Sequence, residues 1–126
     1  MEKEPVEVIR VYTDGSGCRP DGKGSGFAWV RQDTGEKKKV REDGLTNNQA
    51  EYRAILAAAQ ALPEGTRAEI CMDSENTCFQ LKGKRRILDP RLSELAESIE
   101  KVTVERRLVL TFVWVPRREN VAGKLL

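Results

Sequence analysis

The order in which strand-like and helix-like segments follow one another constrains the fold of this chain more than any other feature of its sequence. Short apolar segments bounded by turn residues predict strands at residues 6–13, 25–31, 68–72 and 109–115. A hairpin turn after residue 31 predicts a further strand at 37–42, which is polar enough to lie near an edge. Helical spacing and capping residues predict helices over residues 46–62, about 74–81 and about 89–106, with a helical stub over 121–126. The first strands form an antiparallel meander, whereas the later strand–helix–strand connections require parallel neighbours. We therefore expect an α/β fold, with a mixed five-stranded sheet and helices on both of its faces.

Length and composition predict one domain that spans residues 1–126, because 39% apolar and 33% charged residues are typical of a folded globular protein. No apolar run approaches the roughly 20 residues that cross a bilayer, and the start of the chain lacks the apolar stretch of a secretory signal, so we expect a cytoplasmic protein. Histidine is absent, which excludes Ser–His–Asp triads and histidine-ligated zinc. Cys18, Cys71 and Cys78 lack zinc-type spacing and fit reduced thiols, while a disulfide between two of them remains open.

Acidic residues stand at the edges of predicted elements. Asp14 follows the first strand, Asp73 follows the fourth, and Glu51 lies near the start of the first helix. If the two strands are parallel neighbours, their ends share the rim where α/β sheets bind ligands. Carboxylates gathered there repel one another unless a divalent cation binds, and hard oxygen ligands select magnesium or manganese over zinc. Two such ions, about 3.5–4 Å apart, promote in-line attack of water on a phosphodiester.

Basic residues gather in short runs at 37–39, 82–86, 106–107 and 117–118. Each run alone indicates a solvated surface. Together, on a chain with 22 Lys and Arg against 20 acids, they are compatible with a polyanionic partner.

Three motifs occur in order on the predicted elements: Thr13-Asp14-Gly15-Ser16, Thr46-Asn47-Asn48-Gln49-Ala50-Glu51-Tyr52 and Asp73-Ser74. With them the chain resembles the type 1 ribonuclease H family over nearly its whole length. The resemblance implies hydrolysis of the RNA strand of RNA–DNA hybrids, with 5′-phosphate and 3′-hydroxyl ends. We expect a monomer without an obligate protein partner. Two Mg²⁺ ions would take part in catalysis, and Mn²⁺ is a possible substitute.

The resemblance also implies roles for individual residues. Asp14, Glu51 and Asp73 would be the metal ligands. Gly15 and Ser16 would lie close to the scissile RNA strand, and Thr46 would contact a phosphate of the DNA strand. The amides of Asn47, Asn48 and Gln49 would lie along the minor groove, where they can sense the 2′-hydroxyl groups that distinguish RNA from DNA.

The chain departs from the family at the fourth active-site acid, because no acid follows Glu119. A gapless match places Gly123 at that position, and glycine has no ligand atom in its side chain. A shifted match places Asn120 there, whose amide oxygen can coordinate a hard cation. We prefer Asn120 as the fourth catalytic and metal-binding residue. The alternative is that Asn120 only caps the last helix.

Other features leave further alternatives. The loop histidine of many family members is missing, so water or the metal site must handle its proton. Residues 82–86 either replace the family's basic protrusion or form a solvated loop. Trp29 and Trp114 lie in apolar strand patterns, and we expect both in the core. A nucleic-acid-binding module with weakened catalysis and a DNA-cutting nuclease of the same superfamily remain as competing functions.

Overall fold

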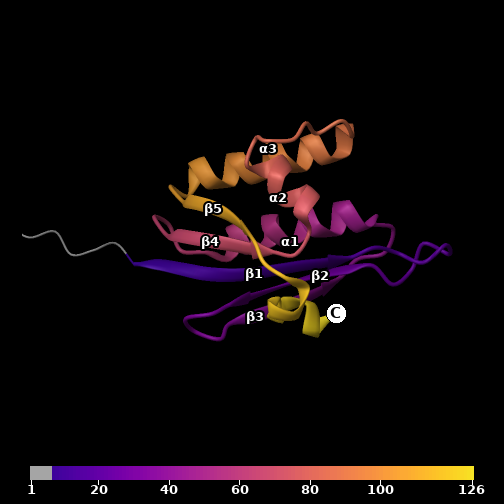
Figure 1. The fold of residues 1–126 in the computed structure, drawn as a ribbon, viewed down its shortest axis with the longest axis horizontal. Coiled ribbons are helices and arrows are strands. Elements are labelled where there is room, and N and C mark those ends of the chain that lie inside the picture. Colours follow the sequence, from indigo (N-terminus) through magenta and orange to yellow (C-terminus); the bar gives the residue numbers. More distant parts are fainter. Residues whose placement is uncertain (1–6) are drawn as a thin grey trace, which may run out of the picture.

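The computed structural model describes residues 7–126, which form a five-stranded sheet with helices packed against it (Figure 1). The strands are β1 (Val8–Ser16), β2 (Gly26–Arg31), β3 (Lys37–Arg41), β4 (Arg67–Met72) and β5 (Val109–Trp114). The helices are α1 (Asn47–Ala61), α2 (Glu75–Leu81) and α3 (Pro90–Glu105), followed by the 3₁₀ segments η1 (Arg117–Glu119) and η2 (Val121–Leu125). None of the helices described is long and apolar enough to span a bilayer.

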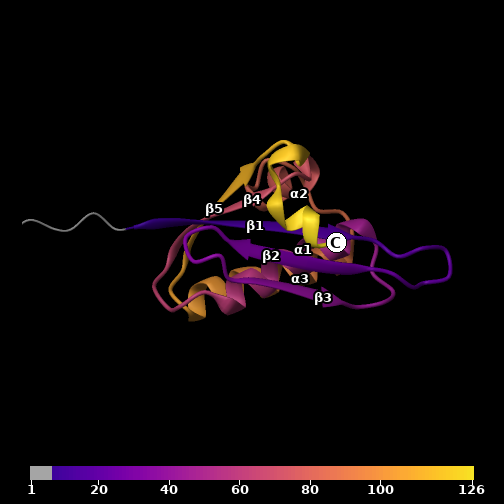
Figure 2. The ribbon, with the colours of Figure 1, turned by 90° about the horizontal axis from the view of Figure 1, so that it is seen from below.

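The sheet has the strand order β3-β2-β1-β4-β5. β2 pairs antiparallel with both β1 and β3, whereas β4 runs parallel to β1 and to β5. The predicted mixed five-stranded sheet is therefore confirmed. Helices α1, α2 and α3 lie on one side of the sheet, and η2 lies on the other (Figures 1 and 2). The second face thus carries a short 3₁₀ segment where the sequence predicted a helical stub.

The first strand extends further than the sequence predicted. We expected it to end before Asp14, but β1 continues to Ser16 because Asp14, Gly15 and Ser16 still pair with β2. The parallel pairing of β1 with β4 stops earlier, at Tyr12 opposite Cys71. Asp14 therefore lies beyond the parallel ladder while β2 still holds its backbone. Residue 6, the first of the predicted strand, lies outside the described residues.

The core lies between the sheet and the helices. Its largest fully buried side chains include Tyr52 and Ile55 of α1 and Ile70 and Met72 of β4. Trp29, with 5% exposure, belongs to this core as predicted.

The prediction that Trp114 is a core residue is wrong, because its side chain is 47% exposed. Trp114 is the last residue of β5, which is an edge strand, so fewer elements surround it. Its indole Nε1–H donates to the carbonyl of Asp73 at 3.2 Å.

Cys18, Cys71 and Cys78 are free thiols, and the last two are buried.

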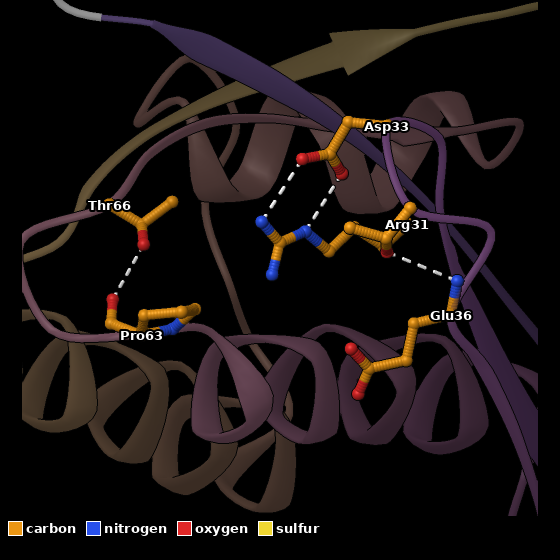
Figure 3. A network of polar contacts seen from close by, with 6 residues as sticks. Arg31, Asp33, Glu36, Pro63 and Thr66 are labelled. Carbon is orange, nitrogen blue, oxygen red and sulfur yellow. Dashed lines mark hydrogen bonds and ion pairs between the residues drawn. The ribbon is translucent and has the colours of Figure 1, made fainter.

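The β2–β3 turn is held by a bidentate ion pair. The Arg31 guanidinium donates to Asp33 through Nε at 2.8 Å and Nη2 at 3.0 Å (Figure 3). Nearby, the Thr66 hydroxyl donates to the Pro63 carbonyl at 2.6 Å and closes the turn that follows α1. These contacts hold the end of the sheet opposite Asp14. The ion pair with Asp33 also balances the charge of Arg31.

Candidate active site

The structure brings Asp14, Glu51 and Asp73 together, as the sequence predicted. One carboxylate oxygen of each residue lies within 4.8 Å of the others. Asp14 comes from β1, Glu51 from the start of α1, and Asp73 directly follows β4. Because β1 and β4 are parallel neighbours, both aspartates reach the same rim of the sheet.

Two glycines allow α1 to approach this rim. A Cβ on Gly15 would lie 2.2 Å from the carbonyl carbon of Ala50 and 2.4 Å from the amide nitrogen of Glu51. A Cβ on Gly17 would lie 2.5 Å from the amide nitrogen of Asn47, whose side-chain oxygen accepts the Gly17 N–H at 2.7 Å. Only glycine permits such a close approach of two backbones. The glycines thereby place Glu51 beside Asp14.

The first turn of α1 is fixed by a capping box. Thr46 Oγ1 accepts the Gln49 N–H at 3.1 Å, and Gln49 Oε1 accepts the Thr46 N–H at 3.0 Å. Gln49 is 7% exposed, so its side chain is occupied by the cap. Asn48 is exposed on the same turn. Asn47 is exposed too, but its side-chain oxygen accepts the Gly17 N–H.

Burial and mutual repulsion perturb the carboxyl groups. Glu51 and Asp14 are each 8% exposed. Burial, followed by the charge of Asp14, raises the pKa of Glu51 to about 9. Burial and the charge of Asp73 also raise the pKa of Asp14. Glu51 Oε2 is buried and has no hydrogen-bond partner among residues 7–126. A group of acids with such an unsatisfied oxygen fits a divalent cation, which would supply the missing positive charge.

The carboxylates face a cavity of about 430 Å³. Gly15, Ser16 and Asn47 line it too. Arg117 also lines the cavity, and its charge acts to lower the pKa of Asp14, although burial outweighs this effect. The sequence showed Arg117 only as half of a basic pair after the last strand. The turn at Pro116 was the one signal that it follows a strand end.

The structure describes Asn120 as a cap, and its preferred assignment as the fourth ligand stays a prediction. Asn120 is 2% exposed, its Nδ2 donates to the Thr13 carbonyl at 2.9 Å, and its Oδ1 accepts the Ala122 N–H at 3.2 Å. It is a cap for η2, which was the alternative. Gly123 lines the cavity instead, and a Cβ there would lie 3.0 Å from Asp14 Oδ2. The position beside Asp14 is therefore taken by a residue without a side chain.

Comparison with known families adds an independent observation to this geometry. The family model for RNase H matches residues 6–116, which include the three clustered acids. The chain belongs to the ribonuclease H family. The match ends before Arg117, so the segment that carries Asn120 and Gly123 lies outside it.

Similar proteins include relatives in sequence and in structure. A ribonuclease H from Acidiphilium cryptum (strain JF-5) is 34% identical over 77 residues, which make up 60% of this chain and 48% of that protein. The chain thus spans about half the length of the curated relative. The crystal structure of LC11-RNase H1 in complex with RNA/DNA hybrid is 31% identical, with 93% of this chain and 92% of that chain covered and a TM-score of 0.80. RNase H1 from the halophilic archaeon Halobacterium salinarum NRC-1 is 26% identical, with 95% and 94% covered and a TM-score of 0.81.

Proposed function

We propose that this member of the ribonuclease H family is an endoribonuclease that hydrolyses the RNA strand of RNA–DNA hybrids and leaves 5′-phosphate and 3′-hydroxyl ends. The observation that carries the proposal is the group of three carboxylates within 4.8 Å, with the unsatisfied Glu51 oxygen among them. The hybrid bound to the similar LC11-RNase H1 supports the choice of substrate.

Asp14, Glu51 and Asp73 would hold the divalent cations, which the family requires. Two bound ions, Mg²⁺ or alternatively Mn²⁺, would activate the attacking water and stabilise the leaving oxygen. The carboxylates supply hard oxygen ligands and no nucleophile of their own. Such a site needs no histidine as a general base, and this chain has none. With Gly123 in place of a fourth acid, the site carries one negative charge fewer, so we expect it to bind metal more weakly than a four-acid site.

Other residues of the cavity would place the RNA strand. Gly15 and Ser16 leave room for its backbone beside Asp14, and Asn47 and Asn48 present amide groups at the start of α1. Thr46 and Gln49 would act mainly by holding that first turn in place, since each is engaged in the capping box. We further propose that the protein is cytoplasmic, because buried free thiols fit a reducing compartment. That it acts as a monomer is part of the same proposal.

The test is a cleavage assay with labelled RNA–DNA hybrid, double-stranded RNA and DNA duplex, each with Mg²⁺, Mn²⁺ or chelator. We expect cleavage of the RNA strand of the hybrid alone, only with metal, and its loss in Asp73→Asn. Glu97→Gln, which removes an exposed acid of α3, is the matched control and should retain activity. Binding of hybrid without cleavage under any metal would refute the proposal in favour of a binding module. Cleavage of DNA duplex would instead assign a DNA nuclease.

A further inference from the structure

We propose that a second, basic cavity beside the carboxylates binds a backbone phosphate of the RNA strand. This phosphate is the one next to the scissile phosphate. The identity of this anion rests on the proposed function. The cavity has a volume of about 240 Å³, and Arg19, Lys39 and Arg41 line it. Ser16 and Leu126 line both this cavity and the carboxylate cavity, so the two adjoin.

The cations converge because of strand geometry. Lys39 and Arg41 are two residues apart on β3 and therefore point to the same face of the sheet. Lys38 and Val40 point to the other face, where they line a cavity with Ala57 of α1. The shared face is the side of the sheet that carries η2 and is free of α1 (Figure 2). Arg41 lies opposite Gly26, two strands away from Asp14 and at the same end of the sheet.

These charges are available for a ligand. Within residues 7–126, neither Lys39 nor Arg41 forms an ion pair with a carboxylate. Arg19 reaches Asp21 at 3.6 Å, but both side chains are more than half exposed, at 62% and 55%, so this pair is weak.

The acids of the neighbouring loop have other partners. Glu42 accepts from Arg53 at 2.6 Å, and Asp43 accepts the Gly24 N–H at 3.1 Å. In the described part of the chain, the two guanidinium groups and the one ammonium group that line this cavity thus have no buried counter-charge. Arginine and lysine in such an arrangement bind phosphate through charge-assisted hydrogen bonds.

The floor of the cavity is fixed before any ligand binds. Ser25 is 1% exposed, and its hydroxyl donates to the Glu42 carbonyl and accepts the Leu45 N–H at 3.1 Å. A Cβ on Gly26 would lie 2.7 Å from the Val40 carbonyl oxygen, so glycine is needed for β2 and β3 to pack this closely. A preformed site loses little conformational freedom when a phosphate enters it.

The arrangement suits a strand whose scissile phosphate lies at the carboxylates. The carboxylate cavity repels phosphate until cations bind there, whereas the adjoining cavity attracts it. A phosphate held at Arg19, Lys39 and Arg41 would fix the register of the strand while carrying no sequence information. Because both cavities share Ser16, which we place near the RNA backbone, the neighbouring phosphate belongs to the RNA strand.

The test compares two double variants that each remove two positive charges from β3. Lys39→Gln/Arg41→Gln removes charges inside the cavity, and Lys37→Gln/Lys38→Gln is the control outside it. Hybrid binding is measured by fluorescence anisotropy in chelator over a series of salt concentrations. For the first variant we expect about tenfold weaker binding and a slope of log K against log salt reduced by about one. The control should keep a slope close to that of the wild type. In cleavage, the first variant should raise KM and leave kcat unchanged.

A hybrid with one neutral methylphosphonate next to a single cleavage site identifies the strand. A neutral linkage in the RNA strand should lower kcat/KM for the wild type and have little further effect on Lys39→Gln/Arg41→Gln. The same pattern for a linkage in the DNA strand, or equal losses of affinity in the two double variants, would overturn the inference. If no metal supports cleavage while the binding slopes still differ as expected, the proposed function fails and the basic cavity stands as an anion site.

Discussion

Glu51→Gln should stabilise the metal-free protein and abolish its response to metal. The carboxyl of Glu51 has a pKa of 4.5 as a free side chain and about 9 in the fold, where burial and Asp14 disfavour its charge. As pH rises above 4.5, the unfolded chain releases this proton before the folded chain does. The stability that the raised pKa contributes is therefore present at low pH and is lost progressively up to about pH 9. At pH 7 the pH lies about 2.5 units above 4.5, and each unit corresponds to about 1.4 kcal/mol, so the loss is up to about 3 kcal/mol.

The assay is urea unfolding of the wild type and Glu51→Gln between pH 5 and pH 8, in chelator and with Mg²⁺. In chelator, the stability advantage of Glu51→Gln should grow with pH by about 1 kcal/mol per unit. Mg²⁺ should stabilise the wild type by mass action and leave the variant almost unchanged. Glu97→Gln, on the exposed side of α3, should lack this pH-dependent advantage and should be stabilised by Mg²⁺ as the wild type is. A difference between wild type and Glu51→Gln that does not vary with pH would refute this reading of the site.

Other substitutions test the remaining parts of the site. Gly123→Asp should tighten Mg²⁺ binding and raise activity at low metal, measured by titration against Gly123→Asn; equal effects of the two would contradict an added ligand. Asn120→Ala should destabilise by about 1–3 kcal/mol through its lost contacts with the Thr13 carbonyl and the Ala122 N–H, while the metal-induced increase in Tm persists. Disappearance of that increase would restore Asn120 as a ligand. Gly15→Ala should destabilise by about 1–3 kcal/mol or prevent folding, as followed by circular dichroism, because its Cβ meets the backbone of α1.

Local patterns in the sequence predicted most of the fold. The turns after residues 31 and 61 and the helical spacing of Ala54, Ile55 and Ala58 are local signals, and the structure follows them. The meeting of Asp14 with Asp73 followed from one topological rule, since the ends of parallel neighbours share a rim. The prediction for Trp114 was wrong because hydrophobicity alone does not distinguish a central strand from the end of an edge strand.

The last segment of the chain could not be predicted in the same way. Asn120 is equally suited to coordinate a cation and to cap a helix, and its distance along the sequence from Asp14, Glu51 and Asp73 does not distinguish these roles. The contact of its amide with the Thr13 carbonyl, 107 residues earlier in the chain, favours the cap, and the Asn120→Ala variant tests the ligand. That contact places η2 across β1 and sets Gly123 against Asp14. The position of the missing acid is thus a property of tertiary packing.

The two cavities have opposite charges, and this suggests a division of labour between substrate binding and catalysis. Carboxylates that bind cations for hydrolysis also repel the phosphates that they must approach. Basic residues close to the metals would strengthen substrate binding, but a cation among the acids would compete with the metal. The fold places the acids and the basic residues in two adjoining cavities that share Ser16 and Leu126. The acids lie at the ends of β1 and β4, and Lys39 and Arg41 lie on β3. Substrate affinity and metal affinity should therefore respond to different substitutions, which the β3 variants and Glu51→Gln address separately.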